Sequence, residues 1–203
     1  MESLALAFSS GWASGVNAYL VVLVLGIAER VDGSAQIPDE LGSWEVLGVA
    51  ALMYAFEFVA DKVPYVDSAW DVVSTLIRPL VGGYVGVLIS GDSTEISGLV
   101  GGSVGGASAL ASHAVKAGTR LAVNASPEPG SNIAISIGED VVVLALVWFA
   151  IEHPYIAAGV AVLLLLIGLV VLYFAIRLIR SGWRRLLAWR HRRRASKQPE
   201  VRR

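Results

Sequence analysis

Carboxylates stand inside stretches of this chain that are otherwise apolar enough to lie in a membrane. Glu57 and Asp61 are four residues apart, a spacing that stacks them on one face of a helix, and Asp67 and Asp71 repeat it. A carboxylate at membrane depth costs at least ~2.5 kcal/mol, so it normally pairs with a cation, faces a cavity or lies near an interface. Six acids are placed in this way: Glu57, Asp61, Asp67, Asp71, Glu139 and Asp140.

Two cations and a histidine are expected at the same depth as these acids. Lys116 and Arg120 end one face of a helix predicted over 96–123, and His113 precedes them on that face. The charges could form a structural network of ion pairs. Alternatively they line a vestibule in which carboxylates handle protons or cations and the two cations hold an anion. Glu57 is the best candidate for a group that binds a coupled proton or cation, because it lies deepest and is flanked by aromatic residues. His113 is a proton relay or a hydrogen-bond partner between helices.

The residue types that most enzymes need are scarce here. The chain has no cysteine, which excludes disulfides, thiol catalysis and cysteine-bound metals. The histidines His113, His153 and His191 are too scattered for a metal site. We therefore predict a protein that is not an enzyme and that uses no cofactor or metal.

The composition is that of an integral membrane protein. Of the residues, 55% are hydrophobic and 16% charged, and the mean hydropathy is +0.64. Because a helix needs about 20 apolar residues to cross a bilayer, we predict an all-α membrane protein with spans at 4–28, 44–60, 72–90, 96–123, 133–151 and 155–179. Arg78-Pro79 interrupts the third span, so 66–79 could instead be an interfacial or re-entrant helix.

The distribution of charge predicts the orientation. Eleven of the sixteen Lys and Arg residues lie between Arg177 and Arg203, whereas acids dominate 29–43, 92–95 and Glu152. Basic segments stay in the cytoplasm, and six spans return the chain to its starting side. We therefore predict a multi-pass protein of the cytoplasmic membrane with both termini cytoplasmic.

Two strings recur about 90 residues apart, which indicates a duplicated unit. Two copies of three spans each would lie upside down relative to one another, as in many transporters. We predict two inverted three-helix repeats, 1–92 and 93–180, followed by a basic cytoplasmic tail, 181–203. The strings are Gly11-x-x-x-Gly15-x-Asn17-Ala18 with Gly102-x-x-x-Gly106-x-Ser108-Ala109, and Ala60-x-Lys62-x-Pro64-Tyr65 with Ala150-x-Glu152-x-Pro154-Tyr155.

The recurring glycines lie on single faces of their predicted helices. Such faces let helix backbones approach closely in lipid, and packing alone would explain them. A sharper hypothesis is that the two glycine faces cross at the repeat interface and leave room for a permeant group. Asn17 and Ser108, equivalent in the repeat, would then offer paired polar contacts. The glycines are Gly11, Gly15, Gly102 and Gly106.

Several unusual strings resemble a bacterial integral-membrane family known as domain of unknown function 4126. They are the segment 57–64, the stretch 120–132 and the string Ser14-Gly15-Val16-Asn17-Ala18. In the family we expect a Gly-Leu-Arg-Ala-like string at the last of these, so Asn17 replaces a cation here. The resemblance extends from Gly11 to Pro154. It implies a multi-span protein of the bacterial inner membrane and no established activity.

The basic tail continues the last predicted span. Tryptophans suit the headgroup level and clustered arginines suit anionic lipid headgroups, so we expect a lipid-surface anchor rather than a nucleic-acid site. The anchor residues are Arg180, Trp183, Arg184, Arg185 and Trp189. For the whole chain two functions remain: a transporter or channel for a small ion or solute, which a homodimer would enclose better, or a scaffold or assembly protein whose charges are structural.

Overall fold

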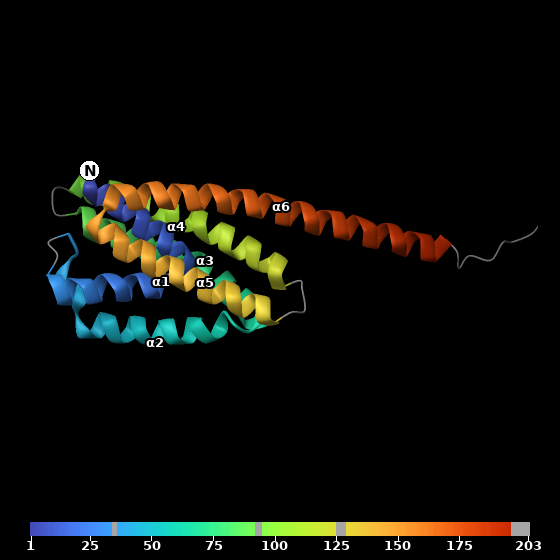
Figure 1. Ribbon diagram of the computed structural model, residues 1–203, viewed down its shortest axis with the longest axis horizontal. Coiled ribbons are helices and arrows are strands. Elements are labelled where there is room, and N and C mark those ends of the chain that lie inside the picture. Colours follow the sequence, from blue (N-terminus) through green and yellow to red (C-terminus); the bar gives the residue numbers. More distant parts are fainter. Residues whose placement is uncertain (34–35, 92–94, 125–128, 196–203) are drawn as a thin grey trace, which may run out of the picture.

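The computed structural model is entirely helical over the residues that it describes, which are 1–33, 36–91, 95–124 and 129–195. Four helices, α1, α3, α5 and α6, are long and apolar enough to cross a membrane. Figure 1 shows them with α2 and α4 in one elongated bundle, from which the end of α6 projects. The elements are α1 (Glu2–Asp32), the 3-10 turn η1 (Asp39–Gly42), α2 (Trp44–Ala60), α3 (Pro64–Ser90), α4 (Glu95–Asn124), α5 (Pro129–Glu152) and α6 (Pro154–Ala195).

Helix α1 is broken in its middle. Asn17 has extended backbone angles, φ −150° and ψ 97°, between two helical halves. The first half runs from the N-terminus into the bundle, and the second half returns to the end from which the chain entered (Figure 1). At that end Glu2 shares a hollow with His153 of the α5–α6 turn, and Gly26 packs against Leu41 of η1. The predicted first span, 4–28, is therefore a re-entrant helical hairpin.

This hairpin affects where the first and last helices end. Helices α2 to α6 alternate in direction, and Met1 and the end of α6 lie at opposite ends of the molecule (Figure 1). The structure therefore does not show the predicted arrangement with both termini on one side, because a length rule cannot tell a span from two half-helices. We call the end that holds Met1 the N-terminal end, and the end that holds the α2–α3 turn the C-terminal end.

The first half of α1 lies alongside α4 and runs parallel to it. Ser108 Oγ donates to the Phe8 carbonyl, Ser112 Oγ to that of Trp12 and Lys116 Nζ to that of Val16. Inverted copies would run antiparallel here, and α4 has no break that matches the one in α1. The two halves of the chain thus have different helix arrangements, unlike the predicted inverted repeats. Only the Pro-Tyr strings keep the expected relation, since they begin α3 and α6 at opposite ends.

Helix α3 continues without interruption through Pro79, so 66–79 is not a separate interfacial or re-entrant segment. The chain does contain a re-entrant element, but α1 forms it. Because α3 begins at Pro64, Asp67 and Asp71 lie in the same helix as Arg78. This continuity places three charged side chains of α3 beside α2 and α4.

Glycines allow α1, α3 and α4 to approach closely. Gly11 and Gly15 of α1 do pack against α4, but against Gly105 and Ala109. Gly102 and Gly106 instead face α3, which contributes a third glycine face that was not among the predicted ones. The two predicted glycine pairs therefore do not meet each other. The α3 face consists of Gly82, Gly83 and Gly86.

Gly15→Ala is expected to destabilise the protein. A Cβ at this position collides with the Ala109 carbonyl and the Ser112 hydroxyl, and one of these is backbone that cannot move aside alone. Overpacking of this kind costs about 1–3 kcal/mol. The measurement is thermal unfolding in detergent. Gly159→Ala on α6 is the matched control, because its Cβ meets open space and alanine favours a helix. Equal unfolding temperatures for the two variants would contradict the close packing of α1 on α4.

Single-cysteine labelling tests the re-entrant hairpin directly, since the chain has no native cysteine. We expect Glu2→Cys and Asp39→Cys to react with an impermeant maleimide from one side of the membrane and Arg180→Cys from the other. A six-span chain gives a different pattern, in which Glu2→Cys and Arg180→Cys share a side and Asp39→Cys reacts from the opposite one. Either outcome is decisive, because the three positions lie outside the bundle core.

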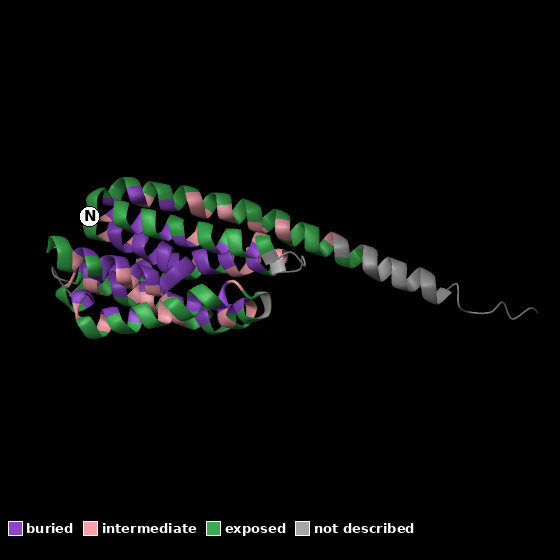
Figure 2. Ribbon diagram, turned by 60° about the horizontal axis from the view of Figure 1, so that its bottom comes forward, coloured by how far each residue is buried: buried purple, intermediate pink, exposed green. Residues whose placement is uncertain are grey.

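Burial differs sharply between the helices. In the most apolar stretch of α1, 78% of the residues are buried, whereas in that of α6 only 6% are. Figure 2 shows the buried residues gathered on the central helices and an exposed α6. Arg180, Trp183 and Arg184 are exposed where α6 leaves the bundle. The side chains of Arg185 and Trp189 lie outside the described residues.

Candidate functional site at the tip of the hairpin

The break in α1 leaves backbone carbonyls without helical partners, and cations from two other helices bind them. Lys116 Nζ of α4 donates to the Val16 carbonyl at 2.9 Å, and Arg78 Nη1 of α3 donates to the Gly15 carbonyl at 3.4 Å. Non-helical backbone at membrane depth is tolerated only where protein or water satisfies it. The carbonyl end of a half-helix also carries partial negative charge, which favours cations there.

Asn17 caps the returning half of α1. Its Oδ1 accepts from the Leu20 N–H at 3.0 Å, which is the bond of an N-cap residue. Because that backbone N–H can only donate, the orientation of the Asn17 amide is fixed. Its Nδ2 therefore donates to Asp140 Oδ1, at 2.9 Å. The tip of the hairpin is thereby joined to a carboxyl group of α5.

Arg78 and Lys116 lie among the acids of α2 and α3. Arg78 pairs with Glu57 at 2.5 Å and with Asp71 at 3.3 Å. Lys116 pairs with Asp61 at 2.8 Å and lies 3.9 Å from Glu57. The side chains of Arg78, Lys116 and Glu57 are each no more than 2% exposed, so these ion pairs are buried away from solvent.

Arg120 makes the densest set of contacts. It pairs with Glu139 at 2.7 Å, and its Nη1 donates to Asn132 Oδ1 at 2.6 Å and to the Asp61 carbonyl at 3.2 Å. Asp61 and Asp67 carboxylates lie 3.6 and 3.8 Å from its guanidinium. Arg120 therefore ties α4 to α5 and to the α2–α3 turn.

His113 connects α3 and α4. Arg78 Nη1 lies 2.8 Å from His113 Nδ1, and because a guanidinium only donates, that nitrogen accepts. The ring is then a neutral tautomer whose Nε2–H donates to Thr75 Oγ1 at 3.0 Å, while Thr75 donates to the Asp71 carbonyl. This geometry suits a hydrogen-bond partner between helices, the simpler of the two roles considered for His113.

We call this set the polar cluster, and its acids outnumber its cations. Six carboxyl groups face three Lys or Arg side chains among the residues that the structure describes, so the carboxyl groups outnumber these cations by three. Two buried carboxylate oxygens, Glu57 Oε2 and Asp61 Oδ1, have no hydrogen-bond partner in this part of the chain. Such an imbalance is costly in a low-dielectric interior unless protons or cations neutralise it. The members are Asn17, Glu57, Asp61, Asp67, Asp71, Arg78, His113, Lys116, Arg120, Asn132, Glu139 and Asp140.

Asp61 lies in the turn between α2 and α3. Burial by itself raises the pKa of its carboxyl, but Lys116 and Arg120 beside it hold that pKa below its usual range. Asp61 is therefore ionised at neutral pH and acts as a fixed counter-charge to these cations. A proton or cation that neutralises part of the excess negative charge therefore binds at other acids of the cluster.

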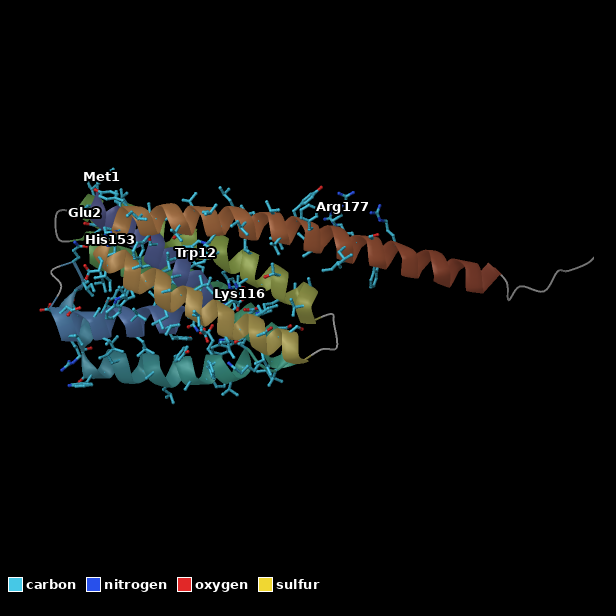
Figure 3. All side chains as sticks on the ribbon, viewed as in Figure 1. Met1, Glu2, Trp12, Lys116, His153 and Arg177 are labelled. Carbon is cyan, nitrogen blue, oxygen red and sulfur yellow. The ribbon has the colours of Figure 1, made fainter. Side chains whose placement is uncertain are left out.

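A cavity of about 290 Å³ reaches the polar cluster from between α1, α4, α5 and α6. Lys116 and Glu139 line it together with apolar side chains such as Trp12 and Leu164. Figure 3 labels Trp12 and Lys116 inside the bundle, away from Met1, Glu2 and His153 at the N-terminal end. Between the cluster and that end lies an apolar core, with Leu25 and Val147 fully buried. The cluster is thus closed towards the N-terminal end by apolar side chains.

A family model described as a domain of unknown function (DUF4126) matches residues 4–174. The chain belongs to this family. The matched range of the DUF4126 domain contains the hairpin and the whole polar cluster, and it ends before the most basic part of α6. No curated protein and no solved structure matches the chain.

In this DUF4126 protein most of the predicted site residues meet, with one exception. Ser108 lies away from Asn17, with its Oγ bonded to the Phe8 and Gly105 carbonyls, so these two positions do not form a polar pair. Arg78 was missed, although an arginine inside an apolar stretch is a signal that a buried acid faces it. The residues brought together are Asn17, Glu57, Asp61, His113, Lys116, Arg120, Glu139 and Asp140.

Proposed function

We propose that this DUF4126 protein transports protons or a small cation across the membrane, and that the polar cluster at the hairpin tip is its ion site. The observation that carries the proposal is the meeting of a broken helix with buried carboxylates that exceed the available cations. A cluster that only held helices together would need no such excess of charge. A permeant proton or cation supplies the missing positive charge.

Broken helices are a recurrent device of transporters, where the ends of half-helices and unwound backbone bind substrate and ions near the middle of the membrane. Here the corresponding atoms are the carbonyls of Gly15 and Val16 and the capped amides after Asn17. The pathway that we propose runs past the hairpin tip, and it replaces the predicted interface between inverted repeats. Because apolar side chains close the N-terminal end, transport requires the hairpin to move.

We propose the bacterial inner membrane as the location, with the C-terminal end of the bundle facing the cytoplasm. This follows the bias of Lys and Arg towards the cytoplasm, since the basic part of α6 leaves the bundle at that end. The exposed Arg180, Trp183 and Arg184 would then meet anionic lipid headgroups. The hairpin supports an N-terminus on the other side of the membrane.

A structural role for the charges is the second candidate, because Arg120 makes the kind of dense network that joins helices in a scaffold or assembly protein. Both candidates share the ion pairs. They differ in whether the excess carboxylates exchange ions with the two aqueous phases.

Reconstitution into proteoliposomes tests the proposal. We expect an imposed pH gradient or cation gradient to relax faster than in protein-free vesicles of the same lipid, as measured with a trapped pH dye and with labelled sodium or potassium ions. A potassium–valinomycin clamp of the membrane potential separates electrogenic flux from exchange. If no ion moves faster than in protein-free vesicles under any gradient, the transport function is rejected and the structural role remains.

A further inference from the structure

Asp140 differs from every other acid of the polar cluster. The other five each have a Lys or Arg nitrogen within 3.8 Å: Glu57, Asp61, Asp67, Asp71 and Glu139. Asp140 has no such partner among the described residues, although it is only 8% exposed. A buried carboxylate without a cation is the group that gains most from accepting a proton.

The two hydrogen-bond contacts that Asp140 makes among the described residues are with neutral groups. Asn17 Nδ2 donates to its Oδ1 at 2.9 Å, and the Tyr54 hydroxyl lies 3.5 Å from its Oδ2. The Asn17 amide cannot turn its oxygen towards Asp140, because that oxygen is bonded to the Leu20 N–H. A metal cation needs several oxygen ligands. Here one of the nearest groups presents an N–H, and no group of three acidic or histidine side chains that could hold a metal is found in the described part of the chain.

We propose that Asp140 is the proton-carrying residue of this protein and that Asn17 couples its charge to the hairpin. A proton from a hydronium ion of the aqueous phase adds to Oδ2, which gives a neutral carboxylic acid and leaves a water molecule, while Oδ1 keeps its bond from Asn17. The charged groups that act on Asp140 from neighbouring elements are Lys116 of α4 and the Asp61–Lys62 pair that follows α2. None of them comes close enough to form an ion pair with it.

The coupling follows from the place of Asn17 in the chain. A charged Asp140 lies beside the positive end of the returning half-helix and strengthens the bond from Asn17, because hydrogen bonds to ionised acceptors are the stronger ones. Protonation removes both effects at the tip of the hairpin. The proton on Asp140 thus weakens the contact that holds the hairpin tip to α5. This use of the proton rests on the proposed transport function, whereas its location on Asp140 does not.

Infrared difference spectroscopy on the reconstituted protein, between acid and alkaline buffer, tests the location of the proton. We expect a carbonyl band of a protonated carboxyl group that is lost in Asp140→Asn and kept in Asp140→Glu and in Glu57→Gln. Asn17→Ala should shift this band to higher frequency, because the carbonyl loses a hydrogen-bond donor. The Asn17 variant keeps the test open if Asp140→Asn does not fold.

The outcomes separate this inference from the transport function. A band that persists unchanged in Asp140→Asn, or that Asn17→Ala fails to shift, overturns the assignment even if the protein moves protons. A band that belongs to Asp140 in a protein without any ion flux supports the assignment and rejects transport. Proton flux that is lost in Asp140→Asn and retained in Asp140→Glu supports both.

Discussion

Arg120→Ala is expected to lower the free energy of unfolding by on the order of 3–5 kcal/mol, since it removes a buried cation that lies beside three carboxylates. The Arg120 side chain is 1% exposed and pairs with Glu139 at 2.7 Å, and Asp61 and Asp67 lie within 3.8 Å of it. Its hydrogen bond to Asn132 is lost as well. Thermal unfolding in detergent measures the change, followed by the intrinsic tryptophan signal.

Two controls define this result. Arg177→Ala removes an exposed arginine of α6 and should change stability by less than about 1 kcal/mol. Adding Glu139→Gln to Arg120→Ala should recover part of the loss, because it removes the carboxylate to which Arg120 lies closest and so reduces the excess of negative charge. If Arg120→Ala unfolds at the temperature of the parent protein, the buried network contributes nothing and the polar cluster as described is wrong.

The helices after the hairpin could be predicted because each has a property that is visible in a short window. The segment predicted at 44–60 coincides with α2, although in the described part of the chain α2 and α4 are not among the helices long and apolar enough to cross a membrane. The meeting of Glu57 and Asp61 with Lys116 and Arg120 was also foreseeable. Helical spacing fixes the face of each charge, and the alternation of spans puts these helix ends at the same depth.

The hairpin could not be predicted in this way. Residues 4–28 are apolar over a full membrane length, and no proline or charged residue marks the break at Asn17. What stabilises the break comes from distant residues, because Lys116, Arg78 and Asp140 bind the atoms that it exposes. A hint lies in the polar side chains of this stretch, Ser9, Ser10, Ser14 and Asn17, all of which are buried. Polar residues in an apolar helix indicate burial against protein rather than lipid.

The predicted inverted repeats, which the structure does not show, depend on the path of the chain in the same way. Gly15 and Gly106 occupy equivalent places in the two strings, yet the partner of each depends on the path of its helix. Once α1 turns back at Asn17, its first half runs parallel to α4 and its glycines meet Gly105 and Ala109. A recurring string therefore indicated which faces are small, but it did not determine which faces meet.

Glu57→Gln is expected to abolish ion flux while it leaves the protein folded. Glu57 is fully buried in α2, where one carboxylate oxygen pairs with Arg78 and the other has no hydrogen-bond partner among the described residues. Glutamine keeps an oxygen that accepts from Arg78, and Arg78 retains Asp71 at 3.3 Å. The loss of stability should then be roughly 1–3 kcal/mol, that of a weakened hydrogen bond between charged groups, and smaller than for Arg120→Ala.

Flux responds differently from stability, since glutamine lacks the negative charge that balances a passing proton or cation. We expect flux in proteoliposomes to fall to the level of protein-free vesicles. Glu45→Gln is the matched control, because it removes an exposed carboxylate from the first turn of the same helix and should leave flux and stability unchanged. Unfolding temperature and flux are to be measured on the same preparations. If Glu57→Gln transports like the parent, Glu57 serves only as the counter-charge of Arg78, and the ion pathway must pass through other acids of the polar cluster.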